Sequence, residues 1–336
     1  MRDECGNEAG VPSSWKKFRY RLEEWGCLWL LRALPRLSRR SCIALAQFLG
    51  AAVYHGDAHG RAVALANLEA VFQDRMSGSE RRRIARESYQ NFARTMLDLF
   101  WARNVGPGNF SEHTLVEGFD EVLERARLEK RGIVFVCAHQ GNWEWAALAF
   151  AQVGGRANIV AQNFKNAALT KLFAALRTHG CHQLIPQQGA MLRLLKCVLR
   201  GESTALLADL SLLPDQGALA LETFGPNPLQ ICATQMHVVL AQRGNALLVP
   251  VITEPLPDGR IRVIAHSPIP AFPERSAQEI AQATWQVFED HILLHPELWL
   301  WSYKHFRFRP KATTRPYPFY ASQSEGFDSL PRGTRN

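Results

Sequence analysis

Residues 132–145 read Gly-Ile-Val-Phe-Val-Cys-Ala-His-Gln-Gly-Asn-Trp-Glu-Trp. The apolar run before His139 has the length and the β-branched content of a buried strand. A Gly-Asn turn follows the histidine, and a helical pattern begins after Asn142. This stretch therefore predicts a strand that carries His139 to its carboxyl end, with Glu144 five residues later on a helix.

Short apolar runs alternate with helical patterns from this point onward. Four further segments are predicted to be strands, namely 157–161, 204–208, 246–252 and 261–265. Strands separated by helical segments indicate βαβ units. We therefore predict an α/β fold with a mixed or mostly parallel central sheet flanked by helices, in which ligands bind beyond the carboxyl ends of the strands.

The N-terminal segment, residues 1–54, differs from the rest. Between residues 15 and 54, tryptophans and leucines are interleaved with lysines and arginines, as in helices that lie in a membrane interface. The same helices could instead pack on the protein's own core. No run reaches the ~18 to 20 apolar residues of a clear membrane span, and the polar start does not fit a secretory signal. We expect this segment to hold the protein at the cytoplasmic face of the inner membrane, either on the surface or as a single pass.

The rest of the chain is predicted to form one domain, which begins with a helical region, and a C-terminal tail. Residues 61–101 are predicted to be helical with a break at 73–78, where Ser77 and Glu80 form a capping box. We place the α/β domain at residues 55–311. Little apolar sequence follows, so we expect residues 312–336 to form a flexible tail.

The composition narrows the classes of function. With 47% apolar and 21% charged residues, the chain is globular, and its net charge of +8 favours an anionic partner such as a phosphate-bearing surface or an acidic carrier protein. Nucleic acid is the weaker choice, because no zinc-finger, basic-zipper or RNA-binding signature occurs. The seven cysteines form no Cys-x-x-Cys pair, and the chain has no dinucleotide loop, P-loop or Gly-x-Ser-x-Gly elbow. We expect neither a metal nor a cofactor.

The pair of His139 and Glu144 suits acyl transfer to a hydroxyl group. An imidazole takes the proton of the alcohol as its oxygen attacks, and a carboxylate on the other ring nitrogen fixes the tautomer. No serine or cysteine nucleophile is needed, because the acceptor hydroxyl itself attacks the thioester. We therefore predict that His139 is the general base and that Glu144 is its partner.

The chain resembles the lipid A biosynthesis (lauroyl/myristoyl) acyltransferase family, which carries a His-x4-Asp/Glu motif. His139 and Gly141-Asn-Trp-Glu144 match the central block of that family, although Gln140 stands where an aromatic is common. Further matches, in chain order, are Arg61, Asn67-Leu68, Phe72, Ser79-Glu-Arg81, Asn163, Leu169, Arg177, Gly180, Leu206-Leu-Ala-Asp209, Phe224-Gly225, Thr234, Pro296-Glu-Leu-Trp-Leu-Trp301, Lys304, Arg307 and Phe308. The sequence departs from the family pattern at two further points. Leu210 replaces a usual glutamine, and the Phe-Gly loop lacks one aromatic residue. Both departures bear on the identity of the acceptor more than on the reaction.

The resemblance implies an O-acyltransferase that needs no cofactor. Its donor would be an acyl-carrier-protein thioester or acyl-CoA, and its acceptor a hydroxyl of a lipid A precursor or a related glycolipid. It adds Asn142, Asn163, Arg177 and Asp209 as candidate substrate-binding residues, of which the last two could instead form a structural ion pair. Trp299 and Trp301 are expected to pack in the core. Open alternatives are another lipid acceptor (mannosylated or ornithine-type), a silent membrane adaptor and a thioesterase.

Overall fold

A computed structural model of the protein describes residues 14–161, 164–178 and 181–331. The strands are β1 (Thr114–Glu117), β2 (Ile133–Cys137), β3 (Ala157–Ala161), β4 (Gln183–Pro186), β5 (Ser203–Leu207), β6 (Ala218–Thr223), β7 (Leu229–Thr234), β8 (Leu247–Pro255), β9 (Ile261–Ala265), β10 (Phe308–Arg309) and β11 (Ser322–Gln323). The α-helices are α1 (Ser14–Ala33), α2 (Arg39–Gly56), α3 (Ala58–Phe72), α4 (Gly78–Trp101), α5 (Phe110–His113), α6 (Phe119–Glu129), α7 (Trp143–Gln152), α8 (Ala167–Arg177), α9 (Ala190–Leu199), α10 (Met236–Arg243), α11 (Ala277–Leu294) and α12 (Glu325–Asp328). Short 3-10 helices occupy Leu34–Arg36, Gln73–Arg75, Ala102–Asn104 and Pro296–Leu298.

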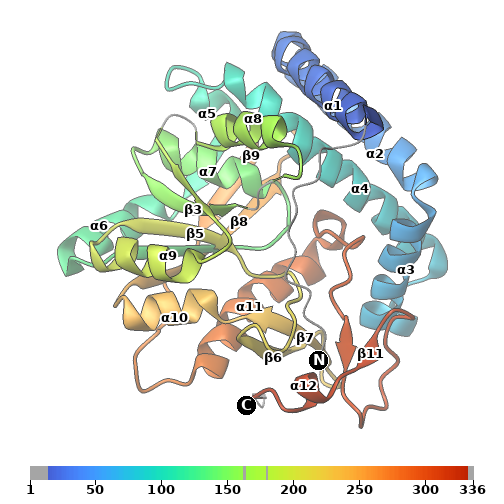
Figure 1. Cartoon of the computed structure of the whole chain (residues 1–336), viewed down its shortest axis with the longest axis vertical. Coiled ribbons are helices and arrows are strands. Elements are labelled where there is room, and N and C mark those ends of the chain that lie inside the picture. Colours follow the sequence, from blue (N-terminus) through green and yellow to red (C-terminus); the bar gives the residue numbers. More distant parts are fainter. Residues whose placement is uncertain (1–13, 162–163, 179–180, 332–336) are drawn as a thin grey trace.

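A central sheet confirms the predicted α/β fold (Figure 1). Within the described residues it has seven strands in the order β1-β9-β8-β2-β5-β3-β4, and every neighbouring pair is parallel except β8 and β9. The five strands predicted from apolar runs are β2, β3, β5, β8 and β9. The sequence did not reveal β1 and β4, because these short strands lie at the two edges of the sheet and bury few side chains.

Strand β2 is buried on both faces. Ile133 and Phe135 pack in the same apolar cluster as Trp145 of α7, whereas Val134 and Val136 join the cluster on the opposite face. This alternation follows from the two-residue period of a strand. It explains why the run before His139 is apolar throughout rather than alternating with polar residues.

Helix α2 belongs to the domain core. It packs along α4 so closely that a Cβ atom on Gly50 would lie 2.4 Å from the backbone of Gln90. Cys42, Ala46 and Tyr54, on the same face of α2, are also buried. The alternative of core packing therefore holds for this helix, and the domain boundary after residue 54 stays a prediction.

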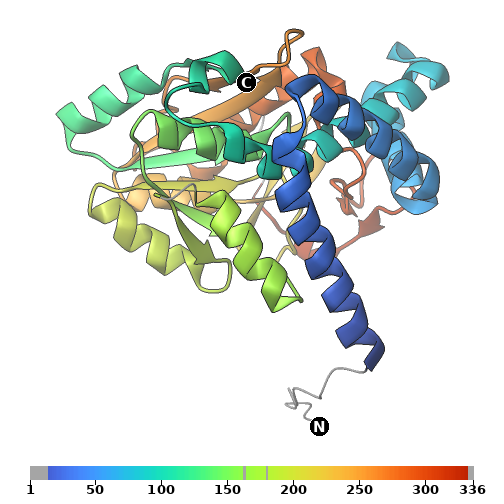
Figure 2. The same ribbon diagram turned by 90° about the horizontal axis from the view of Figure 1, so that it is seen from above.

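Helix α1 lies at the edge of the molecule and runs out from the rest of the domain in Figure 2. One face, with Cys27, Leu30 and Leu31, packs on the domain. Within the described residues, no helix is both long enough and apolar enough to cross a membrane.

The described part of the C-terminal segment is packed against the domain. Phe327 of α12 is fully buried, and the guanidinium of Arg315 donates hydrogen bonds to the carbonyls of Ala70 and Phe224. Arg315 and Phe327 therefore anchor this segment to the domain, and the flexibility expected from residue 312 stays a prediction. Residues 332–336 lie outside the described part of the chain.

Candidate active site

His139 lies just beyond the carboxyl end of β2, as predicted. Strand β5 runs parallel beside β2 with Cys137 opposite Leu207, so the residues two positions further along each strand, His139 and Asp209, meet at the same edge. The Nδ1 atom of His139 lies 2.8 Å from an Asp209 carboxylate oxygen, and the backbone N–H of His139 donates to the other oxygen at 2.9 Å. With Nδ1–H donating to Asp209, the Nε2 atom carries the lone pair of a general base.

Asp209 is an ionised carboxylate in a buried position, with 2% of its surface exposed. Burial alone would raise its pKa. Three neighbours outweigh burial and lower the pKa of Asp209 to about 2. They are His139, through its charge and its hydrogen bond, the nearby His305, and Trp299, whose indole N–H donates at 2.9 Å. The ionised carboxylate therefore stabilises the folded state at pH values above ~3.9, the usual pKa of an aspartate in an unfolded chain. This contribution to stability is lost as the pH falls towards 2.

Glu144 does not occupy the predicted position. Its carboxylate accepts three hydrogen bonds from the guanidinium of Arg177, the shortest 2.6 Å. The expected hydrogen bond between Glu144 and His139 is therefore wrong. Glu144 lies in the first turn of α7 and Arg177 at the end of α8, where each charge also suits the dipole of its helix. A catalytic role for Glu144 stays a prediction, and such a role would act together with Arg177.

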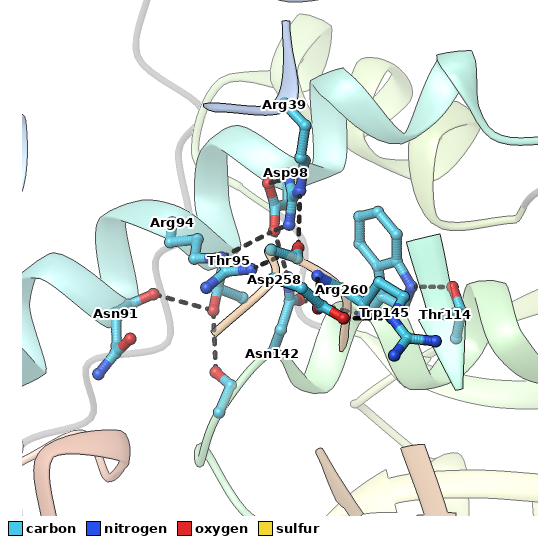
Figure 3. Close-up of polar contacts among 12 residues, drawn as sticks. Arg39, Asn91, Arg94, Thr95, Asp98, Thr114, Asn142, Trp145, Asp258 and Arg260 are labelled. Atoms are coloured by element: carbon cyan, nitrogen blue, oxygen red, sulfur yellow. Dashed lines mark hydrogen bonds and ion pairs between the residues drawn. The ribbon is translucent and has the colours of Figure 1, made fainter. Parts of the chain in front are cut away.

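Asn142 caps α7 and joins a second buried network, shown in Figure 3. Its side-chain oxygen accepts from the N–H of Trp145 at 3.1 Å, and its amide donates to Asp98 at 2.8 Å. Asp98 also accepts a bidentate pair from Arg39, whose guanidinium lies over the ring of Trp101. These contacts give Asn142 a positioning role at the start of α7, and its contact with substrate stays a prediction.

The turn between His139 and Asn142 has little freedom. Gly141 has a φ of +57°, and a Cβ atom there would lie 1.9 Å from the carbonyl oxygen of Thr253. Its own N–H donates to the carbonyl of Leu298 at 2.9 Å, and its carbonyl accepts from the Thr95 hydroxyl at 2.9 Å. Any larger residue at position 141 would displace the turn that holds His139.

Trp299 is a site residue that the sequence analysis assigned to the core. It is fully buried, as expected, but its N–H binds the carboxylate that orients His139. The backbone N–H of Leu300 also donates to the carbonyl of His139 at 3.1 Å. The signal that could have indicated this role is the polar indole N–H, which needs a partner when it is buried. The predicted site residue Asn163 lies outside the described residues.

The thiol of Cys137 is close to this site, but it is not suited to act as a nucleophile. Desolvation, and then the nearby charges of Asp209 and Glu144, raise its pKa to about 12. The thiol is therefore protonated at neutral pH. The chemistry available here is proton removal by His139 rather than covalent catalysis through a cysteine.

A mostly parallel sheet that presents a histidine oriented by a buried carboxylate defines an α/β protein with a candidate general-base site. The family model of the bacterial lipid A biosynthesis acyltransferases matches residues 14–308, and the chain belongs to that family. A comparison with individual curated proteins finds no match. Family membership supports transferase activity of the lipid A acyltransferase type.

Replacing Asp209 by Asn tests the observed partner of His139. The substitution keeps the size of the side chain but removes the charge that stabilises the imidazolium, so kcat should fall by on the order of 10³ to 10⁴. Trp299→Phe keeps an aromatic ring and removes one donor, and should lower kcat by roughly tenfold. Steady-state acyl transfer by both variants, with circular dichroism to confirm folding, gives the comparison. Wild-type turnover in a folded Asp209→Asn protein would disprove the assignment.

A double-mutant cycle tests whether Glu144 and Arg177 act as one unit. Either single change to Gln leaves a mostly buried charge without its partner, so we expect a coupling of roughly 1 to 3 kcal/mol in the free energy of unfolding. The two single variants and the double variant should also lose similar factors in kcat. Additive losses in stability and rate would mean that the two residues work separately.

Proposed function

We propose that the protein transfers a fatty acyl chain from an acyl-carrier-protein thioester, or from acyl-CoA, to a hydroxyl of a lipid A precursor or a related glycolipid. One observation carries this proposal: Asp209 orients His139, whose Nε2 atom has no hydrogen-bond partner among the described residues. The side chain of His139 is 15% exposed, so a substrate hydroxyl can reach it. Family membership supplies the type of reaction.

The reaction follows from this geometry. Nε2 of His139 removes the proton of the acceptor hydroxyl while that oxygen attacks the carbonyl carbon of the thioester. The tetrahedral intermediate then collapses, the carbon–sulfur bond breaks, and the imidazolium returns its proton to the departing thiolate. Asp209 stays ionised throughout and stabilises the imidazolium formed between the two steps.

The outer face of α1 supports a membrane location for this reaction. Trp15, Phe18, Leu22, Trp25 and Trp29 follow each other at intervals of three or four residues, which places them in one stripe along the helix. Each is between 57% and 74% exposed. A stripe of this kind is costly in water but suits the interface of a bilayer. We propose that α1 lies on the inner leaflet, where both the acyl donor and the lipid acceptor can be reached.

Positive charge beside this stripe points to an anionic leaflet. Exposed arginines lie on α1 (Arg21 and Arg32), on the 3-10 helix that follows it (Arg36) and at the start of α2 (Arg40). Basic residues close to an anionic membrane contribute ~1 kcal/mol each. The net charge of +8 also suits an acidic carrier protein as donor. The location and the donor are both part of the proposal.

Purified enzyme tests the proposed reaction directly. The wild-type protein, supplied with an acylated carrier protein or acyl-CoA and a lipid A precursor, should form an acylated lipid that mass spectrometry detects. His139→Ala should lower the rate by ~10² to 10⁴, because the variant lacks the imidazole that takes the proton. Release of free fatty acid at the same rate without the acceptor would contradict transfer and indicate a thioesterase.

Exposed tryptophans offer a milder test of the membrane proposal than deleting residues 1–54, which would remove the core helix α2. Trp25 and Trp29, both changed to Ser, should weaken binding to vesicles that contain anionic phospholipid by about tenfold or more, since burying a large apolar side chain is worth ~1.5 to 3 kcal/mol. Leu294→Ser, at a residue 72% exposed on α11, is the matched control. Equal sedimentation of the double variant and the control with the vesicles would show that α1 is not the anchor.

A further inference from the structure

A second cluster of ionisable side chains lies beside the turn that follows His139, where Gln140 contacts it. Glu254 of β8, His291 of α11 and His295 at the C-terminal end of α11 each place one ligand atom within 4.8 Å of the others. His291 Nε2 lies 2.7 Å from a carboxylate oxygen of Glu254. His291 lies in the last turn of α11 and His295 is the C-cap of that helix, and the centroids of the two rings are 5.0 Å apart.

Each imidazole of the cluster has a polar neighbour at Nδ1. For His291 this neighbour is the side-chain amide of Gln140, at 2.5 Å. For His295 it is the carboxylate of Glu297, at 3.7 Å. Histidines that bind metal ions through Nε2 are commonly oriented by such a contact at the other ring nitrogen. For His291, this contact leaves Nε2, which faces Glu254, as the ring nitrogen that is available to a shared ligand.

The orientation of the Gln140 amide adds an independent observation. Gln140 is 4% exposed, and its side-chain oxygen has no hydrogen-bond partner while its nitrogen faces His291. Oxygen and nitrogen of an amide are exchanged by a simple flip. In the flipped form the oxygen accepts from Nδ1–H of His291, and the lone pair at Nε2 then faces the carboxylate of Glu254. A proton holds these two atoms together at 2.7 Å, and a divalent metal ion can take the place of that proton.

We propose that Glu254, His291 and His295 bind a divalent metal ion of the zinc type. Two imidazoles and one carboxylate form a common protein ligand set for zinc, in which water takes the fourth position. Ligand atoms lie ~2.0 to 2.2 Å from such an ion, so binding opens the His291–Glu254 pair by about half an ångström and draws the ring of His295 inward. The side chain of His295 is 39% exposed, which leaves it free to move.

Neighbouring charges permit this ion. Arg262 is the cation next to Glu254, but it is held by two hydrogen bonds to Glu117, at 2.7 and 2.9 Å. It lies 3.5 Å from the Glu254 oxygen that does not contact His291. The carboxylate oxygen that faces the histidines therefore remains available to the metal.

A bound ion would connect this cluster to the catalytic turn. It would join the end of α11 to β8 and fix His291, whose other nitrogen contacts Gln140, the residue after His139. The metal would not touch the reacting atoms and would act as a structural ion. The proposal does not depend on the acyltransferase reaction, because it concerns binding alone.

Cobalt(II) is the probe for this site, because its visible absorption reports coordination by nitrogen and oxygen ligands. The full-length protein, freed of metal with a chelator and dialysed, should bind about one Co²⁺ per chain. Zn²⁺ should displace this Co²⁺ if the geometry of the site favours zinc. His295→Ala and Glu254→Gln should each weaken Co²⁺ binding by on the order of 100-fold, since each removes a ligand. Glu297→Gln should weaken it by about tenfold, as expected for a residue that orients a ligand.

The controls separate this site from adventitious binding and from unfolding. His59→Ala, at an exposed histidine of α3, should leave Co²⁺ binding unchanged. Zn²⁺ should raise the melting temperature of the wild-type protein and of His59→Ala, but not that of His295→Ala. The proposal fails if wild-type protein retains no Co²⁺ after dialysis, or if His295→Ala and Glu254→Gln, folded by circular dichroism, bind it as tightly as the wild type.

Discussion

A buried negative charge must be compensated, and the carboxylate of Asp209 imposes this requirement on the centre of the molecule. Its three N–H donors come from two different segments, the turn after β2 and the chain after the last 3-10 helix. Satisfying one charge therefore joins the carboxyl ends of β2 and β5 to residues almost a hundred positions further along the chain. The same contacts that compensate the charge also leave Nε2 of His139 without a partner among the described residues, which links stability to the proposed catalysis.

A second buried carboxylate, Asp98, holds the same turn from the opposite side. Through Asn142 it fixes the start of α7, and through Arg39 it ties α2 to α4 (Figure 3). The turn between these two anchors has little conformational freedom, since Gly141 closes against the backbone of β8. Rigid placement of a general base on strand and helix ends is what catalysis requires, because a small misplacement of the reacting groups is costly.

The helices of the N-terminal region divide into two kinds that composition did not distinguish. Both α1 and α2 contain aromatic and basic residues, yet α2 buries its small residues against α4 while α1 leaves its tryptophans in solvent. The difference lies in the small side chains Cys42, Ala46 and Gly50, which allow close packing of two helices. Helix α8 connects the two regions, because Asn166 at its start contacts Tyr20 of α1 and Arg177 at its end pairs with Glu144.

The sequence by itself determined the parts that depend on local pattern. These are the buried strand that ends at His139, the capping box of Ser77 and Glu80, and the alternation that specifies a mostly parallel sheet. It also indicated the family. Only the tertiary structure decided which acid pairs with His139. Glu144 is five residues away along the chain but pairs with Arg177, whereas Asp209 is 70 residues away and lies beside the histidine. The register of β2 against β5 brings those two residues together, and strand pairing is set by packing across the whole sheet, which no local spacing records.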